Sequence, residues 1–412
     1  MTKAASMFAT IGVAGPPAVP PVRRLGTAVV IGASMAGLLT ARVLADHAET
    51  VLVVDRDDLS GPRKGVPQSG QAHVLLAAGA EHLERWFPGF VERAVAAGAC
   101  RVTTARVQIW DDRVPRANGS EVLRLAMTRP FLEELVRREL QAVPNVKISN
   151  GRVSGLTFEG AVVSGVQIED VCEPADFVVD ASGRSSKVGD WLEAAGFSKP
   201  PMVRVASGVN YSTALFRREP GEVPIGLGMA VTGTTRGGAS GGAIFMTVEG
   251  DRWMVVQGGY GAFRPGATNQ DMVERCLKEY PAPFGRVAEN EMLGDVVTYR
   301  FPDNRRRDYW ACERLPARLA VVGDAAASFN PIYGQGISSA ALQAAALSIY
   351  LSADPDLDVP AREFFRMQKV VVDAAWAIAT SGDAAGDAGA ASSLADRVRG
   401  WLVGRVVANR HA

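Results

Sequence analysis

The sequence predicts an α/β fold, in which a Rossmann-like nucleotide-binding domain carries an inserted, mainly antiparallel β-sheet domain and is followed by C-terminal helices. Three observations predict it. Residues 27–55 have the strand–turn–helix–strand order of a dinucleotide-binding unit. Two later apolar runs, residues 175–180 and 318–324, each end at an aspartate near a glycine. After the first of these runs, residues 203–261 alternate β-rich segments with glycine turns, which is typical of antiparallel strands.

The turn of the first unit spans residues 32–37 and reads GASMAG. Gly32 permits the tight turn, and Gly37 lets the helix and strand pack closely. Asp55 follows about 20 positions beyond the glycines, where an acid can accept hydrogen bonds from a ribose. Ser34 replaces the usual middle glycine, at the point where the backbone approaches a pyrophosphate. Serine is small enough for this position, but it departs from the usual pattern.

The last unit is an apolar strand that ends at Asp324, next to Gly323, and continues through Pro331 to a loop with Gly334 and Gly336. An Ala-rich helix begins near Ile337. An acid at this strand end can hold a ribityl hydroxyl, and the free N–H groups of the helix N-terminus can face negative charge on a reduced ring. The alternatives are that Asp324 only caps a helix and that the loop is an ordinary Pro/Gly turn.

These motifs, in this order, resemble the FAD-dependent monooxygenases of the para-hydroxybenzoate hydroxylase fold, from about residue 26 to about residue 380. The segments that read RKGVPQ (residues 63–68, followed by His73), MTRPFLE (127–133) and NPIYGQG (330–336) are similar to bacterial flavin epoxidases of polyether biosynthesis and their uncharacterised relatives. The resemblance implies FAD as the cofactor. It implies NADPH or NADH as the electron source, acting directly or through a separate flavin reductase.

The expected activity is insertion of one oxygen atom from O2 into an apolar, natural-product-like substrate. Epoxidation or hydroxylation would proceed through a flavin C4a-hydroperoxide, with the oxidising power supplied by the cofactor. The runner-up is a flavin-dependent ene-reductase of the geranylgeranyl reductase type, which shares the same motifs. A flavin halogenase is disfavoured, because the sequence has no Trp-x-Trp-x-Ile-Pro motif. A flavin-binding protein without enzymatic activity is a further alternative.

The predicted site has three parts and no metal ligands. Pro331, Tyr333 and Gly334 form the catalytic loop beside the flavin ring, with no general base identified. The inserted sheet offers an apolar wall to the substrate through Phe245, Val255 and Gln257. The expected cofactor-binding residues are Gly32, Ser34, Gly37, Asp55, Arg56, Val66, His73, Arg129, Asp180, Gly323, Asp324, Pro331, Gly334, Gln335, Gly336 and Ile337.

Some of these residues have a second interpretation. Asp180 could instead be a strand-end cap. Arg129 precedes Pro130 at a helix start and reaches FAD by resemblance, but it could be a surface arginine. His73 could orient flavin or substrate, or be a structural histidine. Residues 305–307, three arginines, favour a solvated turn or a carboxylate-pairing cluster over an NADPH phosphate site. The remaining histidines, His47, His82 and His411, are expected at the surface.

The chain is expected to divide into interlocked domains. The C-terminal part should contain a helix at 361–379, a flexible segment at 381–389 and an amphipathic helix at 394–407. The last helix is expected to dock onto the protein, and a lid, a dimer contact or a membrane contact are its alternatives. Residues 1–25 are predicted to be a disordered leader, residues 26–105, 120–200 and 296–355 the FAD-binding domain, residues 106–119 and 201–295 the substrate domain, and residues 356–412 the C-terminal helices.

Composition narrows the function classes. The 412 residues are 47% hydrophobic, enough for a sizeable core, and 44 basic residues balance 44 acidic ones. The zero net charge gives no indication of a nucleic-acid partner. No apolar run reaches the length of a membrane span. Four cysteines without metal-ligand spacing read as reduced thiols, so a cytoplasmic location is expected. The oligomeric state stays open.

Overall fold

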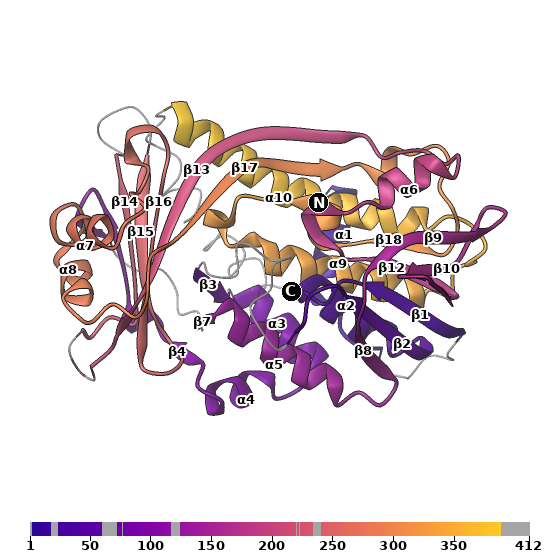
Figure 1. The fold of residues 1–412 in the computed structure, drawn as a ribbon, viewed down its shortest axis with the longest axis horizontal. Helices are drawn as coiled ribbons and strands as arrows, with labels where there is room; N and C mark the ends of the chain where they lie inside the picture. Colours follow the sequence, from indigo (N-terminus) through magenta and orange to yellow (C-terminus); the bar gives the residue numbers. More distant parts are fainter. Residues whose placement is uncertain are drawn as a thin grey trace.

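The computed structural model describes residues 2–17, 24–59, 72–75, 77–116, 124–219, 221, 223–233 and 240–388. For residues 72–74, 77–78, 124 and 381–388 only the backbone is described. The chain forms two parts joined by long strands (Figure 1). One part is a nucleotide-binding domain with helices on both sides of its main sheet, and the other is a large sheet with two helices on its outer face. The predicted α/β fold class is confirmed.

The nucleotide-binding domain is built on a parallel sheet of five strands in the order β18-β12-β1-β2-β8. Their apolar, β-branched sequences suit strands that are buried on both faces. The carboxyl ends of parallel strands meet at one edge, so the aspartates after β2, β12 and β18 gather there. The strands are β1 (Leu25–Ile31), β2 (Ala48–Asp55), β8 (Val146–Asn150), β12 (Phe177–Asp180) and β18 (Leu319–Val321).

Helices and two small sheets complete this domain. The helices are α2 (Met35–Leu44), α3 (Ala77–Trp86), α4 (Phe90–Ala96), α5 (Arg129–Gln141), α6 (Val188–Ala194) and α9 (Gln335–Ser352). The small sheets are β3 (Ala72–Leu75), β7 (Arg124–Thr128) and β4 (Cys100–Val102), and β11 (Val171–Pro174), β10 (Val162–Ile168) and β9 (Val153–Glu159).

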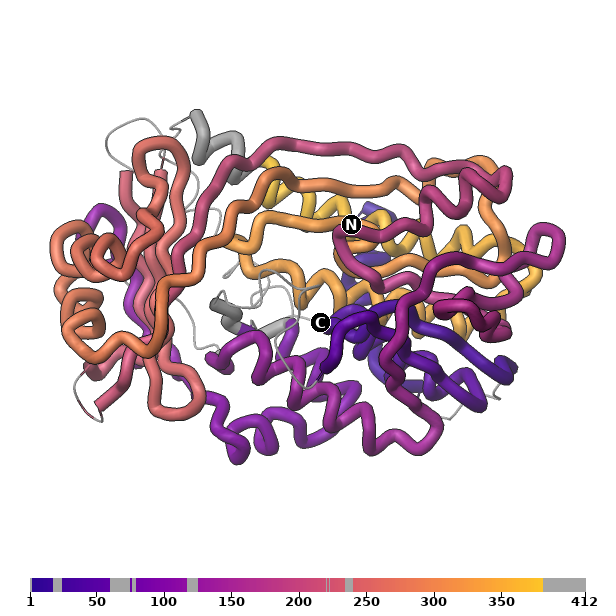
Figure 2. The backbone as a smooth tube through the Cα atoms, in the orientation of Figure 1, coloured from indigo at the N-terminus to yellow at the C-terminus, as the bar shows by residue number. Residues whose placement is uncertain are grey.

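The inserted sheet has eight strands in the order β19-β17-β13-β16-β15-β14-β5-β6. Strands β13 (Met202–Arg217) and β17 (Val297–Arg307) run side by side from this sheet to the nucleotide-binding domain (Figure 2). The assignment of residues 296–355 to the nucleotide-binding domain is therefore wrong for β17. The other strands are β5 (Val107–Asp111), β6 (Val114–Arg116), β14 (Leu227–Thr232), β15 (Gly241–Val248), β16 (Arg252–Gly259) and β19 (Ala327–Ser328).

Each face of the inserted sheet has its own apolar cluster. The outer face packs against α7 (Asn269–Lys278) and α8 (Ala282–Ala288), with Phe245, Trp253 and Phe284 at the centre. The inner face faces the nucleotide-binding domain. Its cluster gathers side chains such as Tyr211 and Met254, together with Ala126 of β7 and Ile332 of the loop before α9.

The N-terminal residues contradict the predicted disordered leader. Lys3–Val13 form helix α1, in which Ile11 is fully buried. This helix packs against α9 and α10, and the Arg85 guanidinium donates to the Gly12 carbonyl oxygen at 2.7 Å. The Gly/Pro-rich composition behind the prediction belongs to residues 15–21, which lie beyond the helix. The apolar residues of the preceding segment are sufficient to dock it.

The C-terminal part also differs from expectation. Helix α10 (Arg362–Ala388) continues through most of the segment predicted to be flexible at 381–389. Alanine is the best helix former, and it outweighs the isolated glycines in this segment. The predicted helix at 394–407 and His411 lie outside the described residues. Within the described part of the chain, no helix is both long enough and apolar enough to cross a bilayer.

His47 and His82 are buried rather than at the surface, with 5% and 2% of their area exposed. His82 lies on α3. Burial, assisted by the charge of Arg85, lowers the pKa of His82 from 6.5 to about 4. The imidazole is therefore neutral in the folded protein at neutral pH.

This burial predicts an acid sensitivity. Below pH 6.5 the unfolded chain binds a proton at His82 that the folded chain does not bind until about pH 4, so the protonated unfolded state gains relative stability as the pH falls. Between pH 8 and pH 5, the native protein should lose about 2 kcal/mol of unfolding free energy through His82, and the His82→Leu variant should not show this loss. Urea unfolding of both proteins at the two pH values measures this. Parallel profiles would contradict the prediction.

Candidate cofactor site

The turn after β1 is built around two glycines that no other residue can replace without movement. Gly32 has a φ of +103°, and a Cβ there would lie 2.6 Å from the Ala181 carbonyl oxygen. A Cβ on Gly37 would overlap the Gly32 carbonyl oxygen. The turn is therefore pressed against both α2 and the end of β12. This leaves the backbone at the start of α2 as the surface that a phosphate group could approach.

Asp55 lies beneath this turn. It is 5% exposed, and its carboxylate accepts hydrogen bonds from the Ala33 N–H at 2.6 Å and the Asp57 N–H at 2.9 Å. The acid therefore stabilises the turn itself, and its contact with a ribose stays a prediction. Arg56, the next residue, is exposed. The sequence pattern singled out Asp55 but did not reveal that its carboxylate holds the turn.

Ser34 is hydrogen-bonded to two side chains of α5. Its hydroxyl donates to Glu133 Oε1 at 2.6 Å and accepts from Arg129 Nη2 at 3.1 Å. Arg129 Nε also donates to Glu133 Oε1 at 2.8 Å. Arg129 is 8% exposed and Glu133 3% exposed, so the surface-arginine alternative is wrong. Glu133 was missed in the sequence, although its position four residues after an arginine on a predicted helix is the signal of an ion pair.

Asp180 is fully buried and its hydrogen bonds are all local. The carboxylate accepts from the Ser182 N–H at 2.9 Å and from the hydroxyls of Ser182 and Ser186 at 2.5 Å each. Burial raises the pKa of Asp180, and these hydrogen bonds act against the rise. The arrangement fits the strand-end cap alternative. It organises the loop that the Gly32 turn packs against.

Asp324 is different, because the described residues offer its carboxylate no hydrogen bond or ion pair. It follows Gly323, whose φ of +62° starts a 3-10 turn at residues 323–325, and it does not cap that turn. Burial raises the pKa of the Asp324 carboxyl. The positive charges of Arg129, Arg184 and Arg307 act against this rise. A half-buried carboxylate without a partner in the described chain fits a ligand contact better than the helix-cap alternative.

The loop before α9 is fixed by Asn330, whose role the sequence did not reveal. Asn330 is 1% exposed, and both its backbone and its side-chain amide are hydrogen-bonded to strands of the inserted sheet. Its backbone N–H donates to Asn304 Oδ1 at 2.7 Å. Its Nδ2 donates to the hydroxyls of Ser207 at 3.1 Å and Tyr260 at 3.0 Å, and its Oδ1 accepts from the Tyr211 hydroxyl.

The residues after Asn330 turn sharply into α9. Pro331–Tyr333 form a 3-10 turn, and Gly334, with a φ of +62°, is the residue before the helix. Gly334 and Gly336 are exposed, and a Cβ built on Gly336 meets no atom within 4 Å. Open space therefore adjoins the backbone N–H groups at the start of α9. A planar ring could approach this backbone closely.

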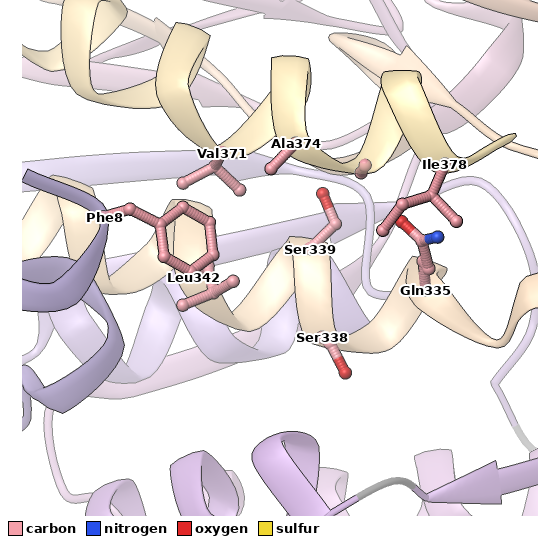
Figure 3. A pocket seen from close by; sticks show the side chains of 9 residues that line it. Phe8, Gln335, Ser338, Ser339, Leu342, Val371, Ala374 and Ile378 are labelled. Carbon is pink, nitrogen blue, oxygen red and sulfur yellow. The ribbon is translucent and has the colours of Figure 1, made fainter. Parts of the chain in front are cut away.

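Three other predicted residues of this loop do not direct their side chains to that open space. Tyr333 is buried in an apolar cluster with Val372 and Ala375 of α10. Ile337 belongs to the core of the nucleotide-binding domain. Gln335 points from α9 toward α10, into a pocket that Phe8 also lines, and its buried Nε2 has no partner among the described residues (Figure 3). Contacts of these residues with a ring would involve their backbone.

The side chains predicted to contact the substrate lie on the wrong face of the inserted sheet. Phe245 and Val255 are fully buried in the outer cluster beneath α7 and α8, and Gln257 donates to the Met272 carbonyl oxygen of α7 at 3.0 Å. Successive residues of a strand point to opposite faces, so their neighbours face the nucleotide-binding domain. The prediction was wrong because the alternation alone does not show which face a helix covers.

The inner face carries a row of mostly apolar residues. They are cross-strand partners in the observed register, so they share one face across five strands. Ile109, Met229 and Ile244 are only half-buried. The row consists of Ile109, Met229, Ile244, Val256 and Thr213.

The three arginines at 305–307 lie in β17, so the solvated-turn interpretation is wrong. Arg305 pairs with Asp303 at 2.9 Å, and Arg306 pairs with Asp373 at 2.9 Å, as in the carboxylate-pairing alternative. Arg307 is buried and donates to two backbone carbonyl oxygens, at 2.8 and 2.9 Å. Its buried position ties β17 to the loops after β12 and β18.

Two predicted residues cannot be placed in the same detail. Val66 lies outside the described residues. His73 belongs to β3, in register with Met127 of β7, and its side chain is not described. No group of three or more His, Cys, Asp or Glu side chains in the described ranges could hold a metal ion.

The chain is similar in sequence to known proteins and in fold to solved structures. No protein-family model matches the chain. Protein Rv3254 of Mycobacterium tuberculosis is 34% identical over 351 residues, an alignment that covers 79% of this chain and 73% of that protein. The probable electron transfer flavoprotein-quinone oxidoreductase YdiS of Escherichia coli is 30% identical over 184 residues, covering 42% of this chain and 40% of that protein.

Solved structures share the fold at low identity. PqsL of Pseudomonas aeruginosa, described as a probable FAD-dependent monooxygenase, superimposes with a TM-score of 0.65 at 18% identity over 93% of this chain and 99% of that one. The tetrameric 2-methyl-3-hydroxypyridine-5-carboxylic acid oxygenase gives 0.63 at 19%, over 91% and 92%. The flavin-dependent brominase Bmp2 gives 0.62 at 16%, over 92% and 88%. The expected monooxygenase fold is confirmed, and the epoxidase subgroup stays a prediction.

The packing of Gly37 predicts the effect of a larger side chain. Gly37→Val places its Cβ against the Gly32 carbonyl oxygen, so either the turn or α2 must shift. The free energy of unfolding should fall by about 1–3 kcal/mol, and the purified protein should lose FAD. Absorbance of the bound flavin and chemical unfolding measure the two effects. A stable variant with stoichiometric FAD would show that this turn does not hold the cofactor.

Asp324 and Asp180 differ in their hydrogen-bond partners, so replacing each by alanine should have a different effect. Asp324→Ala should lower FAD affinity about 10- to 100-fold, because charge-assisted hydrogen bonds to a ligand are worth roughly 1.5–3 kcal/mol. The apo-protein should keep its stability. Asp180→Ala, the matched variant, should instead destabilise the apo-protein, since it leaves the buried Ser186 hydroxyl without an acceptor. Titration with FAD and thermal unfolding separate them. Unchanged FAD affinity in Asp324→Ala would favour a structural role.

Proposed function

The chain belongs to the same family as Protein Rv3254 of Mycobacterium tuberculosis, and we propose that it is an FAD-dependent monooxygenase that inserts one oxygen atom from O2 into an apolar, natural-product-like substrate. The observation that carries this proposal is the pairing of Asp324 with the start of α9. A carboxylate without a partner in the described chain and an open helix N-terminus lie at the two ends of one short loop segment. Both lie in the fold that FAD-dependent monooxygenases share.

Described residues at several places along the carboxyl edge of the parallel sheet would hold FAD. The turn at residues 32–37 and Arg129 would hold the pyrophosphate, and Asp55 would hold the adenosine ribose. Asp324 would hold the ribityl chain. The open space beside Gly336 would admit the edge of the isoalloxazine ring. When bound and reduced, FAD supplies the activation of O2, and the chain supplies binding, orientation and exclusion of water.

The start of α9 would stabilise the reduced ring. This helix spans 18 residues, Gln335–Ser352, and its first N–H groups have no side-chain cap. Partial positive charge at a helix N-terminus favours a nearby anion. Because Asn330 fixes the preceding loop through hydrogen bonds to β13, β17 and Tyr260, these donors stay in place without reorganisation.

The inner row of the inserted sheet would form the substrate wall in place of the three residues predicted from sequence. Its half-buried members, Ile109, Met229 and Ile244, are apolar, so they favour a largely hydrocarbon substrate. The ring loop, residues 330–336, contains no His, Asp or Glu that could serve as a general base. Oxygen transfer to an alkene needs no such base, which favours epoxidation over phenol hydroxylation.

The electron source we propose is NADPH or NADH. Arg204 and Arg305 are partners across β13 and β17, and Arg305 shares the carboxylate of Asp303 with Arg184. Two guanidinium groups pair with this one carboxylate, and Arg204 is the cross-strand partner of Arg305. The resulting excess of positive charge suits a phosphate. Oxidation of NADPH by the purified protein alone would support direct reduction. Its absence would favour a separate flavin reductase.

A flavin-dependent reductase, such as an ene-reductase of the geranylgeranyl reductase type, is the second candidate. It is favoured by the similarity to YdiS, whose name describes electron transfer without oxygen insertion. The brominase Bmp2 has the same fold, but this chain lacks the Trp-x-Trp-x-Ile-Pro motif that a flavin halogenase would need.

Labelled dioxygen separates these candidates. The FAD-loaded protein, reduced and mixed with 18O2 and a panel of apolar alkenes, should give a product that gains one labelled oxygen atom. A product without label, or one reduced at its double bond, would contradict the monooxygenase and support the reductase.

Adjacent residues of β15 should respond differently to truncation. Ile244→Ala, on the inner face, should raise the KM for an apolar substrate about 10-fold, as expected for lost apolar contact, with little change in stability. Phe245→Ala, on the outer face, should lower the free energy of unfolding by about 3–5 kcal/mol. Steady-state kinetics and urea unfolding measure both. An unchanged KM in Ile244→Ala would place the substrate elsewhere.

A further inference from the structure

Ser34 occupies the position of the middle glycine of the usual motif, and its side chain makes hydrogen bonds that a glycine could not make. It is the residue before α2, but its hydroxyl makes no hydrogen bond to the first turn of that helix. The hydroxyl instead donates to Glu133 at 2.6 Å and accepts from Arg129 at 3.1 Å. The first N–H groups of α2 are thus left without a side-chain cap. They stay available to an anionic ligand.

Arg129 and Glu133 form a nearly buried ion pair on the first turns of α5. Their side chains are 10% and 4% exposed, and the nitrogen–oxygen distance is 2.8 Å. Removing one partner of a buried pair is costly, because the other charge is left without compensation. The pair is therefore a rigid support for whatever the guanidinium contacts.

The start of α5 is itself fixed from the inserted sheet. Thr128, the residue before the helix, donates from its N–H and its hydroxyl to the two carboxylate oxygens of Glu249, at 2.9 and 2.6 Å. The backbone that carries Arg129 is held on one side by Glu249. Its side chain is held on the other side by Glu133 and Ser34.

The guanidinium of Arg129 has further N–H donors that could bind a ligand. A guanidinium has five N–H donors, and the described residues accept only from Nε and Nη2 of Arg129. Nη1 has no acceptor among them. The charge of Arg129 also acts on Asp324. Arg129 therefore contacts the turn at residues 32–37 through Ser34, and its charge also reaches Asp324. A guanidinium at this position would suit the pyrophosphate of FAD.

We propose that Ser34 and Glu133 are positioning residues that orient the Arg129 guanidinium toward the FAD pyrophosphate. Serine at this position then strengthens cofactor binding and is not merely tolerated in place of glycine. This inference rests on the proposed function only in taking FAD as the ligand. It predicts that restoring the usual glycine weakens the site.

Binding of FAD, and of its fragments ADP and riboflavin, to the apo-protein tests the proposal. FAD and ADP contain the pyrophosphate, whereas riboflavin does not. In Ser34→Ala, which keeps the backbone, and in Ser34→Gly, the Kd for FAD and for ADP should rise about 5- to 20-fold, and the Kd for riboflavin should not change. Calorimetric titration measures all three. Equal or tighter binding of FAD and ADP in Ser34→Gly would overturn the proposal, as would a uniform loss that includes riboflavin.

A matched pair of glutamates on α5 provides the control. Glu133→Gln should weaken FAD and ADP binding like Ser34→Ala, and the two effects should not add in the double variant, because both act through Arg129. Glu134→Gln removes a neighbouring carboxylate that pairs with Arg137 and Arg138 instead, and it should leave every Kd unchanged. Additive effects of Ser34→Ala and Glu133→Gln would overturn the shared network.

The outcome is distinguishable from failure of the proposed function. If the native protein binds FAD and ADP but yields no labelled product from 18O2, the monooxygenase assignment fails while the positioning role is still measured. If the native protein binds FAD and Ser34→Gly binds it equally well, only the positioning role fails.

Discussion

The hydrogen bonds of Asn330 are the constraint on which the geometry of the site depends. This buried amide belongs to the loop that precedes α9, yet its partners lie on β13 and β17 of the inserted sheet and at Tyr260, the residue directly after β16. A buried amide left unsatisfied would cost roughly 1–3 kcal/mol. The loop and these parts of the inserted sheet must therefore keep one mutual arrangement. The distance between the proposed ring site and the inner face of the inserted sheet is set by hydrogen bonds with defined directions, which apolar packing alone would not provide.

The sequence predicted the parts of this fold that depend on local steric rules. Gly32 and Gly37 were identified because a turn that packs a helix against a strand leaves no room for a Cβ, and the structure contains both contacts. The order of strands and aspartates predicted the edge of the sheet at which we propose that FAD binds. These rules act within a few residues, so one sequence contains all the information that they need.

The sequence did not predict features that depend on long-range pairing. Alternation along β15 and β16 showed that Phe245 and Met246 face opposite ways, but only the docking of α7 and α8 decides which face is outside. Helix α1 docks through residues whose partners are more than 300 positions away. Asn330 and Glu133 are also bonded to distant strands or turns, and their immediate neighbours in the sequence do not reveal it.

Asp180 and Asp324 both lie at strand ends, but the residues that follow them differ in their hydrogen-bond donors. Asp180 is followed by serines at 182 and 186, which supply the donors that a buried carboxylate requires. Asp324 is followed by alanines at 325–327, which supply none from their side chains. A protein that half-buries a carboxylate without providing hydrogen-bond donors incurs a desolvation cost, which the hydroxyl groups of a ligand would reduce. The composition of the residues after each strand therefore separates the structural acid from the candidate binding acid, although the strands themselves read alike.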